Sequence, residues 1–345
     1  MPRPEPDLLL EFACGVILLL GVMLYAVLGG ADFGGGVWDL LARGRRAEQQ
    51  REVIAHAIGP IWEANHVWLI FVIVLVFTIF PPVFAALSVA LYIPLSLALL
   101  GIVFRGAAFI FRTPARDVSY MGGAWDRVFA MASTVTPMFF GMAAGAVASG
   151  QIRVEGGVVT SDLWRTWLAP FPVAIGLLAL ATCAYLAAVY LTLETTGELQ
   201  EDFRRRALGA AAAFALLAAI ALVLSRSGAP EIWTGLTGGP GLIVLLVSIG
   251  VALLSGWAVW ARRFRLARGG AVVEVALLLA GWALAQYPYL VVPDYTFENA
   301  ASSPAMMRAS LVVFGLGALI LLPSLWFLFR VFKADLPGVV EVGDG

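Results

Sequence analysis

The chain has 345 residues, of which 61% are hydrophobic and only 13% are charged. Soluble globular proteins carry about 25% charged residues, so this composition excludes a soluble enzyme and a disordered protein. The net charge of -1 also excludes the basic surface of a nucleic-acid binder. The composition therefore predicts an all-α polytopic membrane protein that contacts membrane lipid and has no nucleic-acid partner.

Apolar runs long enough to cross a bilayer occur nine times, since a spanning helix needs about 20 mostly apolar residues. They cover residues 8–30, 61–80, 83–104, 126–148, 167–192, 207–225, 241–260, 271–290 and 309–329. Only Phe80-Pro81-Pro82 separates the second run from the third, which predicts a tight hairpin because proline disfavours helix continuation. The first run is too long for a signal-peptide core and follows acidic residues, so we expect no cleavage.

Arginine placement predicts the orientation of these helices. Sixteen of the 22 Lys and Arg residues fall in the connections that follow odd-numbered runs or in the C-terminal tail. Five fall on the other side, and Arg105 lies at the end of the third run. By the positive-inside rule, the sixteen are cytoplasmic, which places the N-terminus outside and the C-terminus inside.

The polar connections divide the chain. The longest, residues 149–166, is predicted as an outer loop with four runs before it and five after, the last of them at 309–329. That arrangement permits two four-helix bundles, at residues 1–148 and 167–290. Residues 291–345 then hold an outer loop, a peripheral ninth helix and a cytoplasmic tail. Residues 45–58 mix polar and apolar side chains and predict a short interfacial helix.

Four ionisable residues share one depth in this topology. Asp32 lies near the cytoplasmic end of the first helix, Glu63 and His66 lie one or two turns into the second, and Arg105 ends the third. Glu63 and His66 are three residues apart and lie on one helical face. Ionisable groups inside a membrane are usually functional or paired, so the cluster is either a proton path open to the cytoplasm or an ion-paired helix cap.

Other glycine, acidic and proline positions are interpreted as structural, without a role in chemistry. Gly30 and Gly34 have the small-xxx-small spacing that favours close helix packing over a phosphate loop. We expect Glu194 and Glu274 to be solvated or capping carboxylates at cytoplasmic helix ends, and Pro288 to kink the eighth helix.

Haem or metal ligation by this chain is not expected. Its two histidines, His56 and His66, are ten residues apart, which is about 15 Å along one helix and too far for a shared iron. A mixed His/Met site stays open, given eight methionines. The two cysteines, Cys14 and Cys183, form no C-x-x-C pair, which argues against a zinc site or a disulfide framework.

Several motifs resemble subunit II of the cytochrome bd quinol oxidases. In order, they are Gly30–Gly36, Ile58–Ile70, Phe104–Gly106, Gln286–Pro293 and Ala300–Pro304, and they span about residues 15 to 330. The Gly-Pro-x-Trp-acid-x-Asn-x-x-Trp-Leu block within the second motif is the most specific. The resemblance implies nine helices arranged as two four-helix bundles plus one peripheral helix, in a bacterial inner membrane.

The resemblance also implies a role. Subunit II of this family carries no haem and stabilises subunit I, which holds haem b and haem d. The complex oxidises quinol and reduces oxygen to water, with protons drawn from the cytoplasm. A structural quinone bound to this chain and a small single-helix accessory subunit stay open.

The family's proton-entry acids match Asp32 and Glu63, and its buried basic residue matches Arg105. Three positions depart from the family pattern. Ala31 replaces the usual phenylalanine, Glu63 the usual aspartate, and His66 the usual Gln or Glu. Because histidine titrates near neutral pH, His66 is a further proton-path candidate.

Trp62 and Asn65, in the same sequence block, are interpreted as structural partners of the acid cluster, with Arg105 as its charge partner. Two competing hypotheses remain. One is a proton-coupled secondary transporter, against which the sequence shows no interrupted helices in matching halves. The other is a purely structural oxidase subunit whose acids carry no protons.

Overall fold

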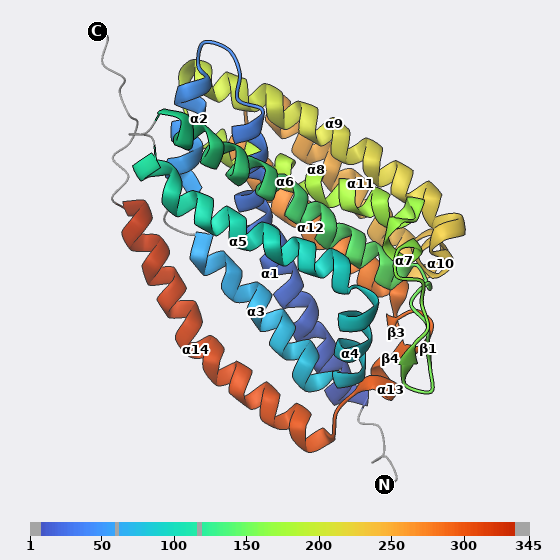
Figure 1. Cartoon of the computed structure of the whole chain (residues 1–345). Helices are drawn as coiled ribbons and strands as arrows, with labels where there is room; N and C mark the ends of the chain where they lie inside the picture. Colours follow the sequence, from blue (N-terminus) through green and yellow to red (C-terminus); the bar gives the residue numbers. More distant parts are fainter. Residues whose placement is uncertain (1–7, 59–61, 116–118, 335–345) are drawn as a thin grey trace.

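The computed structural model describes residues 8–58, 62–115 and 119–334, which are almost entirely helical (Figure 1). The long helices are α1 (Leu8–Leu40), α3 (Trp62–Ile79), α5 (Tyr92–Ala115), α6 (Ser119–Ala148), α8 (Pro170–Leu191), α9 (Gly197–Gly228), α11 (Gly239–Trp260), α12 (Phe264–Gln286) and α14 (Pro304–Ala334). The short helices are α2 (Ala47–Ile58), α4 (Pro81–Ala90), α7 (Arg165–Leu168), α10 (Pro230–Thr237) and α13 (Phe297–Ala300). Two small hairpins pair β1 (Val154–Glu155) with β2 (Val158–Val159), and β3 (Tyr289–Val291) with β4 (Tyr295–Thr296).

The prediction of an all-α polytopic protein is confirmed. Within the described ranges, eight helices are long and apolar enough to span a membrane. The number rises to nine if the bent pair His66–Ile79 and Pro81–Ala90 counts as one span.

The third predicted helix, residues 83–104, is wrong. The chain turns by 118° between α3 and α4, breaks again at Leu91, and the spanning segment is Tyr92–Phe111. Pro81 and Pro82 occupy the first turn of α4, where proline has no intrahelical hydrogen bond to lose. A short transverse helix therefore replaces the predicted tight hairpin.

The predicted kink at Pro288 is also wrong, because α12 ends at Gln286. A residue that precedes proline is disfavoured in the helical conformation, which ends the helix before Pro288. The side chain of Gln286 then donates hydrogen bonds to the carbonyl oxygens of Tyr289 and Leu290, at 3.3 and 3.0 Å. The chain continues as β3, which pairs antiparallel with β4.

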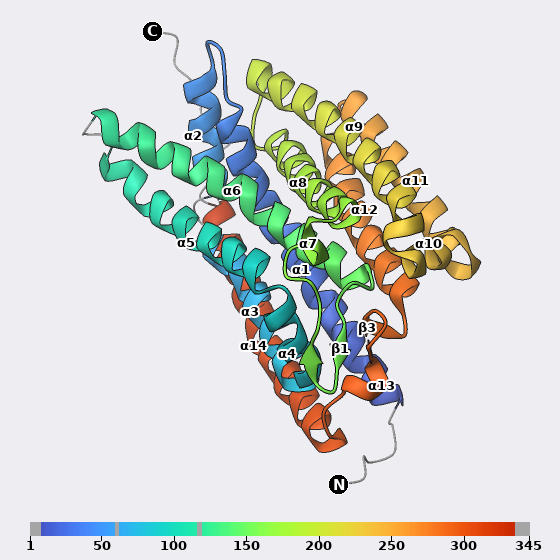
Figure 2. The same ribbon diagram turned by 45° about the vertical axis from the view of Figure 1, so that its right-hand side comes forward.

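Helices α1 and α6 lie between two groups of neighbours (Figure 2). One group contains α3, α5 and α14, and the other contains α8, α9, α11 and α12. Both α1 and α6 pack directly against α8. The division into two bundles at residues 149–166 therefore stays a prediction.

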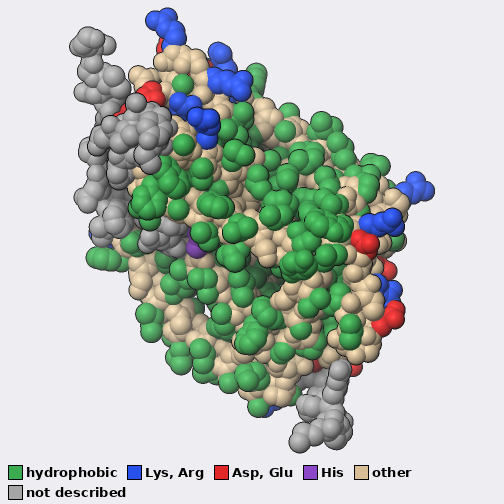
Figure 3. All heavy atoms as spheres, in the orientation of Figure 1, with side chains coloured by type: hydrophobic (Ala, Val, Ile, Leu, Met, Phe, Trp, Pro, Cys, Tyr) green, Lys and Arg blue, Asp and Glu red, His purple; other side chains and the backbone are tan. Residues whose placement is uncertain are grey.

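The two ends of the helix array differ. The hairpins, α10 and α13 lie at one end, and α2 lies at the other (Figure 1). Hydrophobic side chains cover the middle of the surface, basic side chains lie at the α2 end, and a mixed group of basic and acidic side chains lies on the opposite side (Figure 3). Helix α14 lies along the edge with residues such as Leu319 and Ile320 more than 70% exposed, as a lipid-facing helix requires. The short helix expected at 45–58 is present as α2, while its place at a membrane surface and the orientation of the termini stay predictions.

Candidate functional site

Glycines bring three helices into close contact around Asp32. A Cβ atom at Gly34 would overlap the carbonyl group of Cys183, so α1 and α8 touch through their backbones. A Cβ atom at Gly36 would overlap the side chain of Ser133 on α6. The close packing predicted for Gly30 and Gly34 is therefore present, and its partner is α8.

The ion pair between Asp32 and Arg105, the residue expected to be the charge partner of the acid cluster, is the centre of the site. Arg105 on α5 donates a hydrogen bond from Nη2 to Oδ1 of Asp32 on α1 at 2.6 Å. The residues are only 2% and 4% exposed, so the ion pair is excluded from bulk water. The second carboxylate oxygen, Oδ2, is also buried and accepts no hydrogen bond within the described part of the chain.

Ser133 and two aromatic rings fix the guanidinium of Arg105. Its Nε donates to the hydroxyl of Ser133 on α6 at 3.0 Å. Its Cζ lies 5.1 Å from the ring centroids of both Phe33 and Phe129, within the range of cation–π attraction. Three helices, α1, α5 and α6, thus hold the arginine in one orientation.

His66 on α3 lies beside this ion pair, with Phe33 between them. The ring centroids of His66 and Phe33 are 6.1 Å apart, and those of His66 and Tyr25 are 6.4 Å apart, both in edge-to-face geometry. The structure therefore brings Asp32, Arg105 and His66 into one neighbourhood, as their shared depth predicted.

Three predicted site residues lie at the start of α3. Trp62, Glu63 and Asn65 occupy the first turn of α3, one turn or less before His66. Their side chains lie outside the described residues.

Sequence reasoning missed Tyr25, Phe129 and Ser133. Tyr25 is seven residues before Asp32, and two helical turns place both on one face of α1, so spacing could have indicated it. Its hydroxyl is buried without a hydrogen-bond partner among the described residues. No sequence signal distinguishes Phe129 or Ser133 from the other aromatic and hydroxyl residues of α6.

The prediction for Glu274 is wrong. This residue is 4% exposed on the buried face of α12, and its Oε2 has no hydrogen-bond partner within the described ranges. Glu194 is exposed just beyond the end of α8, as a solvated carboxylate should be. The two acids that sequence reasoning treated alike therefore have opposite environments.

The spacing argument assumed that both histidines lie on one helix, and the structure differs from that assumption. His56 is on α2 and His66 is on α3, so they do not share one helix. Across the residues that the structure describes, no three His, Cys, Asp or Glu side chains gather as candidate metal ligands.

The comparisons of this chain with known proteins agree on one family. A profile of the family described as cytochrome bd terminal oxidase subunit II matches residues 10–332. The putative cytochrome bd menaquinol oxidase subunit II of Bacillus subtilis (strain 168) is 23% identical over 328 residues, which cover 91% of this chain and 93% of that protein. The cytochrome bd-I ubiquinol oxidase subunit 2 of Escherichia coli (strain K12) is 30% identical over 211 residues, which cover 59% of this chain and 54% of that protein.

The fold has a solved counterpart. The structure of bd oxidase from Geobacillus thermodenitrificans matches with a TM-score of 0.80 and 22% identity, and covers 95% of this chain and 100% of that chain. At this identity the likeness establishes the fold.

Proposed function

The chain belongs to the cytochrome bd terminal oxidase subunit II family, and we propose that it works as the haem-free subunit of a bacterial quinol oxidase that reduces oxygen to water. Its multi-pass helices and its bacterial relatives place it in the bacterial inner membrane. The names of two relatives include menaquinol and ubiquinol, so a quinol is the shared electron donor class. Haem b and haem d belong to subunit I in this proposal, and the present chain stabilises that subunit by pairing with it.

We further propose that Asp32 lies on a path that carries protons from the cytoplasm toward the partner's oxygen-reducing site. The supporting observation is the buried Asp32–Arg105 pair, in which Oδ1 is held by arginine and Oδ2 has no described partner. Arg105 supplies the opposite charge that makes a carboxylate tolerable at this depth. The remaining oxygen is then free to accept a hydrogen bond from water and to pass on a proton.

His66 and Glu63 complete the proposed path. Histidine is a common proton shuttle in proteins, and the imidazole of His66 contacts Phe33, the ring that also packs against Arg105 of the ion pair. Glu63 precedes His66 by three residues on α3, at the end of that helix that faces the cytoplasm in the predicted topology. The proposed order is Glu63 and His66 at the entrance and Asp32 deeper in the membrane.

The first experiment purifies the tagged chain from its native membrane in mild detergent and records the reduced-minus-oxidised spectrum. The proposal requires a co-purifying subunit with haem b and haem d bands. A chain that purifies alone without haem, and that drives proton-coupled substrate uptake, would instead establish the transporter hypothesis. In the described helices, one bent pair is present, whereas a transporter of that type needs interrupted helices in both halves.

The second experiment tests the proton path in the intact complex. We expect Asp32→Asn to lower oxidase turnover by at least about tenfold, because the amide cannot relay a proton. Proton uptake by proteoliposomes should slow equally, the haem spectrum should stay unchanged, and Asp32→Glu should restore part of the activity. The matched control is Asp294→Asn, which removes the ion pair with Arg153 at the opposite end of the molecule.

Glu63→Gln separates the proton path from a purely structural role for the acids. Full turnover in an assembled Glu63→Gln complex would remove Glu63 from the path. Full turnover in both Glu63→Gln and Asp32→Asn complexes would leave only the structural role.

A further inference from the structure

A basic pocket lies at the α2 end of the molecule, away from Asp32. It has a volume of about 460 Å³ and opens between the α1–α2 connection and the first turns of α9. Its charged lining residues are Arg43, Arg45, Arg46, Asp202, Arg205 and Arg206. The pocket is large enough for a small organic anion.

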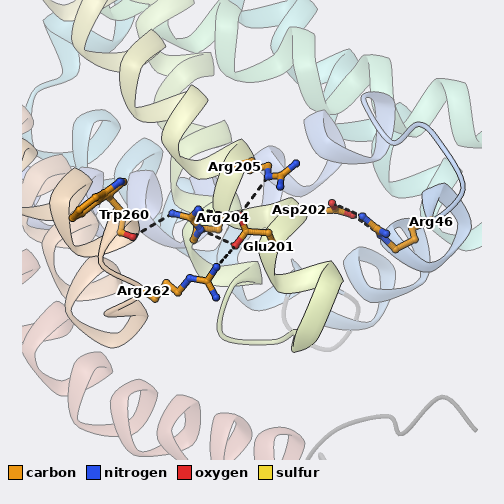
Figure 4. Close-up of polar contacts among 7 residues, drawn as sticks. All are labelled: Arg46, Glu201, Asp202, Arg204, Arg205, Trp260 and Arg262. Atoms are coloured by element: carbon orange, nitrogen blue, oxygen red, sulfur yellow. Dashed lines mark hydrogen bonds and ion pairs between the residues drawn. The ribbon is translucent and has the colours of Figure 1, made fainter.

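Positive charge dominates this pocket even after its ion pairs are counted. Arg46 is neutralised by Asp202 and Glu198, with nitrogen–oxygen distances of 2.7 and 2.6 Å (Figure 4 shows the Asp202 contact). Arg205 contacts Glu201, at 3.4 Å. Five arginines against three acids leave a surplus of two positive charges at the pocket.

The acid beside Arg205 is shared among three arginines. Glu201 also accepts hydrogen bonds from Arg204 at 2.8 and 2.9 Å and from Arg262 at 3.1 Å (Figure 4). Its contact with Arg205 is the longest of these, and the Arg205 side chain is 75% exposed. Arg205 is therefore the least neutralised of the three and is available to a ligand.

The side chain of Arg206 is held in place at the pocket by two aromatic rings and a hydrogen bond. Its Cζ lies 5.4 Å from the ring of Trp38 and 5.3 Å from that of Phe203, and its Nη2 donates to Oε1 of Gln50 at 2.6 Å. Its other terminal nitrogen, Nη1, is buried without a hydrogen-bond partner among the described residues. The guanidinium of Arg206 is therefore held in one position and contributes a fixed positive charge to the lining of the pocket.

An exposed apolar stripe continues from the pocket along α9. Gly209, Ala212 and Leu216 follow Arg205 at intervals of three or four residues, so they lie on one helical face. All three are exposed, and a Cβ at Gly209 would meet no atom within 4 Å. A ligand whose charged group occupies the pocket can thus lay an apolar tail along the helix.

We propose that this pocket binds the phosphodiester headgroup of an anionic phospholipid, with its acyl chains along the exposed face of α9. The proposal goes beyond the oxidase function; besides the pocket and the stripe, it uses the predicted orientation, in which this end faces the anionic cytoplasmic leaflet. A free phosphate shares the headgroup chemistry but has no acyl chain that could pack along the apolar stripe.

The test titrates the delipidated oxidase complex by calorimetry with short-chain phosphatidylglycerol, short-chain phosphatidylcholine or inorganic phosphate. We expect clear preference for phosphatidylglycerol. The double variant Arg43→Gln/Arg45→Gln should bind it about 25-fold more weakly, at about fivefold per arginine near an anionic surface. The matched control Arg263→Gln/Arg265→Gln removes two exposed arginines at the same end, outside the pocket, and should bind as the unmodified complex does.

Three results would overturn the proposal. They are equal weakening by both double variants, no preference over phosphatidylcholine, and inorganic phosphate binding as tightly as the lipid. If no haem-bearing partner co-purifies, the oxidase function fails separately. The same titration on the purified full-length chain then still decides the lipid site.

Discussion

The Arg105 guanidinium donates a 2.6 Å hydrogen bond to the Asp32 carboxylate, and the two residues are 2% and 4% exposed. Removing both charges from water costs several kcal/mol, which their attraction repays only with good geometry and further hydrogen bonds. Ser133 supplies one such bond to Arg105, but Oδ2 of Asp32 has none within the described residues. A pair that is only partly satisfied is better explained by function than by stability.

Breaking this pair should be costly. Arg105→Gln leaves the Asp32 carboxylate buried without a counter-charge, so we expect a loss of about 3–5 kcal/mol in stability. The measurement is the thermal inactivation midpoint and yield of the assembled oxidase. The double variant Asp32→Asn/Arg105→Gln removes both charges and should recover much of the loss, because contacting residues are energetically coupled. A double variant no more stable than Arg105→Gln would contradict this account.

The close contact of α1 with α8 makes a prediction about Gly34. A helical Gly→Ala change normally stabilises by about 1 kcal/mol. At Gly34 the added methyl group would overlap the Cys183 carbonyl, so the helices must separate. We expect Gly34→Ala to destabilise the protein by about 1–3 kcal/mol, measured by thermal unfolding.

Gly250 provides the matched control for that change. It lies within α11, and an added Cβ would meet no atom within 4 Å. Gly250→Ala should therefore leave stability unchanged or raise it. Equal destabilisation by both variants would mean that the α1–α8 contact is looser than the backbone distances indicate.

Most of the long helices and the shared depth of Asp32, His66 and Arg105 could be predicted from the sequence, because both depend on where polar residues interrupt apolar runs. The turn between α3 and α5 could not. Pro81 and Pro82 indicated the break after α3, but the chain stays apolar through α4 and Leu91, so hydropathy registers neither the second break nor the direction of α4. Ser133 was also beyond prediction, since its role depends on lateral contact between α5 and α6, which no single-helix pattern contains.

The burial of Glu274 was missed for a different reason. Arg265 and Arg268 suggested that the helix begins after them, which put Glu274 at its end. Helix α12 begins at Phe264, so Glu274 lies ten residues in, about 15 Å along the axis. The buried positions Ala267, Ala271 and Glu274 follow helical spacing, and extending the periodicity through the arginines would have revealed the burial.

The buried Glu274 carboxyl should be dispensable for stability. Its Oε2 has no hydrogen-bond partner in the part of the chain described, and a buried unsatisfied polar atom costs about 1–3 kcal/mol. Glu274→Met keeps a similar volume without that cost, so we expect the unfolding midpoint to rise by the equivalent of about 1 kcal/mol. Glu274→Ala, which leaves a cavity, is the comparison and should destabilise. A fall in the midpoint for Glu274→Met would show that the carboxyl has a stabilising role.

Asp162 in the predicted outer loop should make α7 sensitive to acid. The backbone N–H groups of Arg165 and Trp164 donate to its Oδ1 at 2.7 and 2.9 Å and lower the pKa of Asp162 below its ordinary value of 3.8. Because the folded pKa is the lower one, the stabilisation is complete above 3.8 and is lost as the pH falls through the lowered value. Hydrogen–deuterium exchange at Trp164 and Arg165, corrected for its intrinsic pH dependence, should therefore accelerate only below about pH 3.8. Asp162→Asn keeps an acceptor that does not titrate, so its exchange should show no such step, and a step that persists in this variant would assign the acid sensitivity to another group.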